Sequence, residues 1–177
     1  ITFHPHRFFE PRIKGNDALI EEATKLIAKA KKPIFYVGGG CINSGPKASK
    51  LVREFVKISG APASMTLMGL GTLPASDPLS LGMLGMHGMY EANLAMHECD
   101  VMVNIGARFD DRVTGRLDAF SPNSKKIHID IDASSIQKNI KVDIPIVGDV
   151  EAIIEQIIAS WKKNNYSIEN EALSAWW

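Results

Sequence analysis

Amphipathic segments alternate with short apolar runs along most of this chain. Apolar residues recur at helical spacing in residues 17–31, 46–59, 88–99 and 149–163. Largely apolar runs, typical of buried strands, occupy residues 33–37, 61–67, 100–105, 126–131 and about 144–147. Because such strands alternate with amphipathic helices, the sequence predicts a doubly wound α/β fold. We expect a five- or six-stranded parallel sheet with helices on both faces.

Residues with strong positional preferences mark the ends of the predicted helices. Asn16 can cap a helix that begins at Asp17, and Pro46 suits the first turn of the next helix, which Gly60 ends. Residues 68–88, which are rich in glycine, and the polar residues 107–124 show no helical period. Long irregular segments inside a domain are usually functional or disordered, so these two are candidate functional segments.

Composition and charge exclude several classes of protein. Lys plus Arg and Asp plus Glu balance at 20 each, and the pI is near 7.1, which disfavours non-specific nucleic-acid binding. No apolar run approaches the roughly 20 residues that cross a bilayer. Two cysteines, Cys41 and Cys99, cannot build a disulfide framework or a structural zinc site. The histidines show no metal-ligand spacing, so we expect no metal held by this chain alone.

The residues that follow the predicted strands carry the candidate chemistry. Ligands of open parallel sheets bind beyond the carboxyl ends of the strands. The segments at those positions are Gly38–Gly40, Met68–Gly71, Gly106–Arg112, Asp130–Asp132 and Gly148–Asp149. Backbone NH groups, arginines and carboxylates in one crevice suit a phosphate-bearing, hydroxylated ligand, for which we expect a nucleotide. The dinucleotide fingerprint G-x-G-x-x-G fails in every register, so the segment is not an ordinary NAD-binding unit.

Each of these features also has an interpretation without a ligand. The triple glycine can be a tight β-to-α turn, and the methionines of residues 65–89 can fill a core. His87 alone is more often a hydrogen-bonded structural residue than a ligand. The charged loop 108–116 can be a solvated surface loop with compensating ion pairs. Within it, Arg108 or Arg112 could hold a phosphate while Asp110 and Asp111 orient the two guanidinium groups.

Four motifs in this order identify a family resemblance. They are M-T-L-M-G-L-G, L-G-M-H-G, G-A-R-F-D-D-R-V-T-G and H-I-D-I-D. Together they resemble the central domain of the catalytic subunit of acetolactate synthase, also called acetohydroxyacid synthase, over roughly residues 33–158. The resemblance implies a Rossmann-like domain of the DHS-like, NAD/FAD-binding type within a thiamine-diphosphate enzyme. It implies a bound FAD without a redox role in the reaction, in which one pyruvate is decarboxylated and joined to a second 2-ketoacid for branched-chain amino acid synthesis.

The resemblance also implies roles for individual residues. Those expected to bind FAD are Gly38, Gly39, Gly40, Thr66, Leu67, Met68, Gly85, His87, Gly88, Gly106, Arg108, Asp110, Arg112, Val113, Asp130, Ile131 and Asp149. Met86, Asp111 and Arg112 are expected to border a channel for substrate and inhibitors. We expect no catalytic residue in this chain, because thiamine diphosphate and Mg²⁺ belong to the first and third domains of the family.

The expected domain organisation follows from the same resemblance. Residues 1–15 are expected to be an interdomain linker, 16–163 the central domain, and 164–177 the start of a linker to a further domain. Alone, the 177 residues are expected to be inactive. Full-length chains are expected to form a homodimer or homotetramer in the cytoplasm of a bacterium or the matrix of an organelle; a regulatory subunit is left open. Two alternatives remain: a self-sufficient FAD- or NAD-binding module, and the central domain of another thiamine-diphosphate enzyme, an oxidase or a carboligase.

Overall fold

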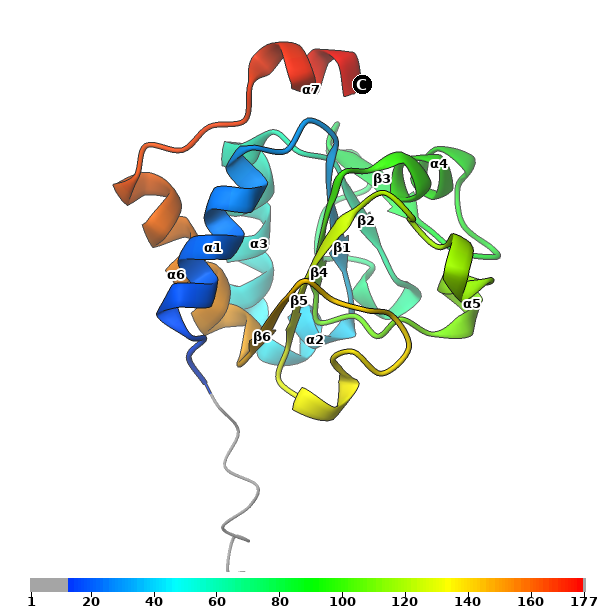
Figure 1. Ribbon diagram of the computed structural model, residues 1–177, viewed down its shortest axis with the longest axis horizontal. Coiled ribbons are helices and arrows are strands. Elements are labelled where there is room, and N and C mark those ends of the chain that lie inside the picture. Colours follow the sequence, from blue (N-terminus) through cyan, green and yellow to red (C-terminus); the bar gives the residue numbers. More distant parts are fainter. Residues whose placement is uncertain (1–12, 177) are drawn as a thin grey trace, which may run out of the picture.

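The computed structural model describes residues 13–176, which form a six-stranded sheet with helices on both faces (Figure 1). All neighbouring strands pair in parallel, in the order β3-β2-β1-β4-β5-β6. The strands are β1 (Pro33–Val37), β2 (Ala63–Met65), β3 (Ser80–Met83), β4 (Val101–Ile105), β5 (Lys125–Asp130) and β6 (Ile144–Val147). The predicted doubly wound α/β fold is therefore confirmed. The order reverses between β1 and β4, and this is the point where such sheets bind ligands.

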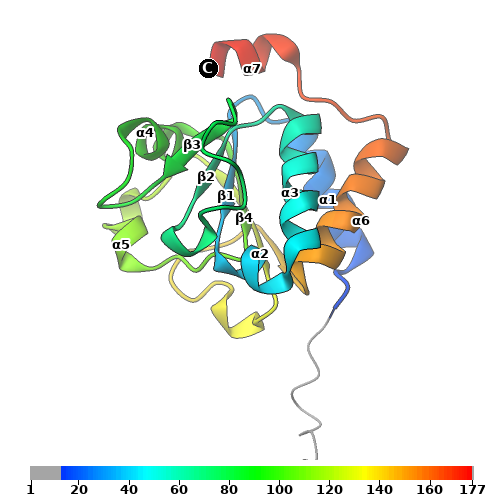
Figure 2. The ribbon, with the colours of Figure 1, turned by 180° about the vertical axis from the view of Figure 1, so that it is seen from behind.

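Helices cover the two faces of the sheet unequally. The helices are α1 (Asp17–Ala28), α2 (Gly39–Ser44), α3 (Pro46–Ser59), α4 (Tyr90–Glu98), α5 (Asp111–Thr114), α6 (Val150–Lys163) and α7 (Asn170–Trp176). Helices α1, α3 and α6 pack together on one face over the larger apolar core (Figures 1 and 2). The other face carries α4, α5 and a smaller core that includes Tyr36, Met102 and Phe109. Both faces of the central strands are therefore buried, as their continuous apolar character predicts.

The helix boundaries follow the capping residues in the sequence. The Asn16 side chain accepts hydrogen bonds from the amides of Ala18 and Leu19, and Gly60 ends α3 in the left-handed conformation with a φ of 72°. The side chain of Asp149 accepts from the amide of Glu151 at the start of α6. These predicted boundaries are confirmed, except that α1 ends at Ala28 rather than near Lys31.

Three elements lie where the sequence predicts irregular structure. Strand β3 lies within residues 68–88, at the edge of the sheet and only half-buried, so it needs no unbroken apolar run. Helix α2 begins directly at Gly39, in the expected glycine turn. The short helix α5 lies within residues 107–124. Each is too short or too exposed to give a periodic apolar pattern.

The sequence predicts interdomain linkers at the two ends of the chain. Most of the first, residues 1–15, lies outside the described residues. In the second, residues 164–177, the structure forms helix α7, whose Trp176 Nε1 donates a hydrogen bond to the carbonyl of Pro33 at 3.0 Å. The assignment of these segments to interdomain linkers stays a prediction.

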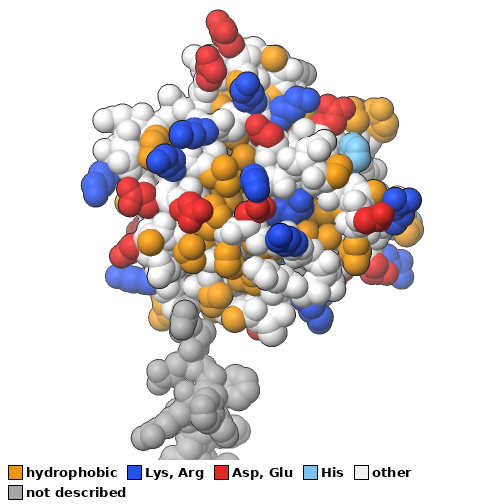
Figure 3. All heavy atoms as spheres, in the orientation of Figure 1, with side chains coloured by type: hydrophobic (Ala, Val, Ile, Leu, Met, Phe, Trp, Pro, Cys, Tyr) orange, Lys and Arg blue, Asp and Glu red, His pale blue; other side chains and the backbone are white. Residues whose placement is uncertain are grey.

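The described surface and interior agree with the composition. Basic and acidic side chains are interspersed on the face shown in Figure 3. Within residues 13–176, no helix is both long and apolar enough to cross a membrane. Cys41 and Cys99 are both buried free thiols, and burial raises the pKa of the Cys99 thiol to about 11.

The chain segments that leave β1 and β4 touch backbone to backbone. A Cβ added to Gly38 would lie 2.3 Å from the carbonyl oxygen of Gly106 and 2.4 Å from the Cα of Ala107. The Gly40 amide donates to the same Gly106 carbonyl at 2.9 Å. Gly38 has a φ of −110°, which any residue can adopt, so the contact alone requires glycine there.

We predict that Gly38→Ala lowers the free energy of unfolding by about 3 kcal/mol or more, because two rigid backbones must separate to admit one methyl group. Gly39→Ala is the matched control, since its added Cβ would lie 2.9 Å from the Cβ of Met68 and 3.6 Å from the Met68 carbonyl oxygen. We expect this control to lose clearly less stability than Gly38→Ala, because its one close contact is with a single exposed residue and alanine favours a helix. Denaturant unfolding measures both, and equal losses would contradict the backbone contact.

Candidate functional site

A cleft of about 510 Å³ opens at the carboxyl ends of β1, β2, β4 and β5, where the strand order reverses. It is lined by Tyr36, Gly39, Gly40, Asn43, Thr66, Leu67, Met68, Gly106, Ala107, Arg108, Asp110, Arg112, Val113, Asp130, Ile131 and Ser135. A second hollow of about 140 Å³ shares Gly40, Asn43, Gly106, Asp130 and Ile131 with it and adds Ser44, Asp149 and Val150. Because they share walls, the two hollows form one elongated site over the sheet edge.

The structure brings together most of the residues that the resemblance assigns to FAD. Twelve of them line the cleft, and Asp149 lines the adjoining hollow. Gly38 lies buried beneath the cleft. Gly85, His87 and Gly88, and the channel residues Met86 and Asp111, are absent from both linings.

The segment 85–88 touches the site only through its neighbour α5. The Met86 amide donates to the carbonyl of Arg112 at 3.0 Å, and a Cβ on Gly85 would lie 2.9 Å from that same oxygen. The side chains of Met86 and His87 are exposed. A ligand in the cleft would reach this segment by extending past Arg112 and Val113, which line the cleft.

Arginine and aspartate side chains form ion pairs at the mouth of the cleft. Arg108 Nη2 lies 3.2 Å from Asp110 Oδ2, and Arg112 Nε lies 3.9 Å from Asp111 Oδ2. Both arginine side chains are more than two-thirds exposed, at 72% and 75%, so such pairs add little to stability. The pairs lie beside the cleft, where the guanidinium groups can donate bidentate hydrogen bonds to the oxygens of a diphosphate.

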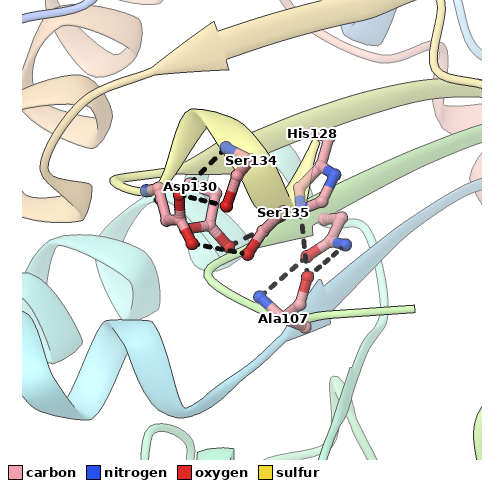
Figure 4. Close-up of polar contacts among 7 residues, drawn as sticks. Ala107, His128, Asp130, Ser134 and Ser135 are labelled. Carbon is pink, nitrogen blue, oxygen red and sulfur yellow. Dashed lines mark hydrogen bonds and ion pairs between the residues drawn. The ribbon is translucent and has the colours of Figure 1, made fainter. Parts of the chain in front are cut away.

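Two aspartates stand at the ends of β5 and β6. Asp130 Oδ1 accepts a hydrogen bond from the amide of Asp132 at 2.9 Å, in the turn drawn in Figure 4. Asp149 Oδ1 accepts from the Ser44 hydroxyl at 2.8 Å as well as capping α6. A carboxylate at a strand end is suited to accept hydrogen bonds from the hydroxyls of a ribose.

Several residues of the lining were not predicted from the sequence. Asn43 and Ser44 belong to α2, a short helix that lies between the glycine turn and Pro46, where no helix was expected. Ser135 lies in the turn after β5. Tyr36 lies inside an apolar strand whose residues look like core, and the only available signal was its place two residues before the glycine turn.

Tyr36 is fully buried, and its hydroxyl has no hydrogen-bond partner within residues 13–176. Burial raises the pKa of Tyr36, and the nearby Asp110 carboxylate raises it further, so the hydroxyl stays protonated. We predict that Tyr36→Phe leaves the free energy of unfolding unchanged or raises it by up to about 1 kcal/mol, because no bond is lost with the hydroxyl. Denaturant unfolding tests this, and a loss of more than about 1 kcal/mol would show that the hydroxyl has a partner.

No group of three or more His, Cys, Asp or Glu side chains within residues 13–176 is arranged to hold a metal ion. The expectation that this chain alone binds no metal stays a prediction.

The fold and the cleft define the class of protein first: a doubly wound α/β domain with a ligand site at the switch point of its sheet. Residues 20–157 match the family described as "Thiamine pyrophosphate enzyme, central domain", and the chain belongs to this family. The resemblance deduced from the four motifs is therefore confirmed.

Curated relatives narrow the likeness to acetolactate synthases. The chain is 44% identical over 171 residues to the acetolactate synthase large subunit of Buchnera aphidicola subsp. Schizaphis graminum, which covers 97% of this chain and 29% of that protein. It is 42% identical over 171 residues to the acetolactate synthase isozyme 3 large subunit of Escherichia coli, and this alignment covers 97% of this chain and 29% of that protein. It is 48% identical over 153 residues to the probable acetolactate synthase large subunit of Methanocaldococcus jannaschii, covering 86% and 25%. The chain thus spans less than a third of the length of these relatives.

Proposed function

We propose that residues 16–163 are the central domain of an acetolactate synthase catalytic subunit and that the cleft at the β1–β4 crossing binds FAD. The observation that carries the proposal is the chemistry of this one cleft. Arginines lie at its mouth, an exposed apolar pair, Leu67 and Met68, lies in its wall, and a strand-end aspartate, Asp130, lies at its far side. The identity of 42–48% to acetolactate synthase large subunits supports the same conclusion.

The residues of the cleft match the parts of FAD in order. The wide hollow beside Leu67 and Met68 offers apolar contact to a flat ring, since both side chains are more than two-thirds exposed. Arg108 lines the same cleft, and its guanidinium group would bind the diphosphate. The smaller hollow with Ser44 and Asp149 takes the adenosine. The main cleft, of about 510 Å³, is within the roughly 300–1,000 Å³ that small-molecule sites occupy.

The reaction itself belongs to the whole protein in this proposal. Acetolactate synthase decarboxylates pyruvate and joins the remaining two-carbon unit to a second 2-ketoacid, with thiamine diphosphate and Mg²⁺ held by domains outside this chain. Met86, Asp111 and Arg112 would border the substrate channel. Their exposed side chains are available to neighbouring domains or subunits of a homodimer or homotetramer. This chain's own contribution is to bind and orient FAD at the wall of that channel.

We predict that the 177-residue chain binds FAD with a Kd in the micromolar range and that Arg108→Ala raises this Kd about 10- to 100-fold. The range corresponds to the roughly 1.5–3 kcal/mol of a hydrogen bond to a charged group. Isothermal titration with FAD measures both values. Arg116→Ala is the matched control, since Arg116 pairs with Asp118 at 2.7 Å outside the cleft lining. Equal losses in both variants would contradict the site, and nanomolar binding by the isolated chain would contradict the view that neighbouring domains share it.

In the full-length protein, we predict that Arg108 and Arg112 divide their roles although both line the cleft. Arg108 directly follows the buried Ala107 at the strand end, whereas Arg112 lies farther out, on α5. Arg108→Ala should therefore raise the FAD concentration needed for activity. Arg112→Ala should chiefly change the apparent KM for ketoacid or the sensitivity to channel-binding inhibitors. Steady-state kinetics at varied FAD concentration test this. The same FAD defect in both variants, with normal ketoacid kinetics, would contradict the division and show that both arginines bind the flavin cofactor.

A further inference from the structure

Three hydrogen bonds converge on a single residue beneath the mouth of the cleft (Figure 4). The Ala107 amide donates to Asn104 Oδ1 at 3.0 Å, and the Ala107 carbonyl accepts from Asn104 Nδ2 at 2.7 Å. The same carbonyl lies 3.0 Å from His128 Nε2. A carbonyl oxygen only accepts, so Nε2 carries the proton and donates. The backbone of Ala107 is therefore held from both sides by buried side chains.

These side chains belong to a buried polar row across four strands. Ser64, Tyr36, Asn104 and His128 are register partners on β2, β1, β4 and β5, and all are fully buried. Asn104 commits both ends of its amide to Ala107. Polar groups at such positions are expensive unless they are hydrogen-bonded, and here Asn104 and His128 direct their bonds to the loop after β4 rather than to neighbouring strands.

The loop after β4 alternates between buried and outward-facing residues. Ala107 and Phe109 are 2% and 4% exposed, whereas the side chains of Arg108 and Asp110 are 72% and 49% exposed. The Phe109 ring packs edge-on against His128, with 5.2 Å between ring centroids. The position of the inner residues thus fixes the direction in which Arg108 and Asp110 extend.

We propose that Asn104 and His128 are positioning residues for ligand binding: by holding the Ala107 peptide, they set Arg108 and Asp110 at the mouth of the cleft. This inference rests on the proposed FAD site and deepens it, since neither side chain is in the cleft lining. It assigns the two residues to the part of the ligand that Arg108 contacts, the diphosphate, and not to the adenosine end.

The first test compares two ligands in the full-length protein. Asn104→Leu, which keeps the branched side-chain shape and makes neither bond, should raise the Kd for FAD about tenfold or more and leave the Kd for adenosine, which carries no phosphate, within about twofold. His128→Leu should also raise the Kd for FAD, and His128→Gln should restore FAD affinity, since its amide can donate to the Ala107 carbonyl. Equal losses for FAD and adenosine in Asn104→Leu, or no rescue by glutamine, would overturn the proposal.

Ser64→Ala is the matched control. Ser64 lies in the same row and donates to the Gly82 carbonyl at 3.0 Å, but it makes no bond to Ala107. This variant loses a buried hydrogen bond as the others do, so it should lower the melting temperature and leave the Kd for FAD unchanged. A weakened FAD affinity in Ser64→Ala would show that general destabilisation, and not positioning, explains the effects at Asn104 and His128.

A double-mutant cycle tests whether Asn104 acts through Arg108. If it does, Asn104→Leu should change the FAD Kd less than about twofold when Arg108 is already alanine, whereas the losses of stability should add. Additive effects on the Kd would overturn the proposal.

Amide hydrogen exchange tests the proposal without any ligand. Exchange of residues 106–110 should be faster in Asn104→Leu than in the unmutated protein and unchanged in Ser64→Ala. If the unmutated full-length protein does not bind FAD, the proposed function fails. The exchange measurement then still tests whether Asn104 holds the backbone of Ala107 in place. Unchanged exchange in Asn104→Leu would overturn the inference even where FAD binds.

Discussion

The close contact between the turns after β1 and β4 is the constraint on which the rest of the structure depends. Gly38 and Gly40 lie against Gly106 and Ala107 with no room for a side chain, and the Gly40 amide donates to the Gly106 carbonyl. Beyond this contact, the chain segments that follow β1 and β4 diverge. The first enters α2 and then α3 over the larger core, and the second crosses to the smaller core through Ala107 and Phe109. The divergence creates the crevice, and the contact closes its floor.

This contact changes the role of the glycines. Glycines after a strand suggest close approach to a ligand, and in dinucleotide-binding loops their amides face the phosphates. Here the amides of Gly38 and Gly40 donate to the carbonyls of Ile105 and Gly106, so backbone already occupies them. These two amides are therefore not free to bind a diphosphate in the proposed FAD site, and Arg108 is the cation nearest to the crossing along the chain.

The sequence predicted the frame of the molecule better than the details of its site. Buried strands and capped helices carry periodic or unbroken apolar signals, whereas β3 and α2 are too exposed or too short to do so. The rule that ligand groups follow parallel strands placed Arg108 and Asp130 at the sheet edge, where both line the cleft; their role in ligand binding stays a prediction. It could not find Asn104 or His128, since these lie inside strands and act through another residue's backbone. Their only trace was one polar residue within each of the apolar segments VMVNI and IHI.

Such polar letters in central strands oppose the packing that stabilises the sheet. Leucine or valine in place of Asn104 and His128 would bury more apolar surface. It would also remove the buried Nδ1 atom of His128, which has no hydrogen-bond partner within residues 13–176. Burying a polar group without a partner costs about 1–3 kcal/mol, and the Tyr36 hydroxyl also has no partner within residues 13–176. The polar row becomes favourable where one loop must adopt a single conformation, because directional hydrogen bonds select a geometry that apolar contacts do not. The row lies directly under the loop that presents Arg108, where a fixed geometry matters most for binding a charged ligand.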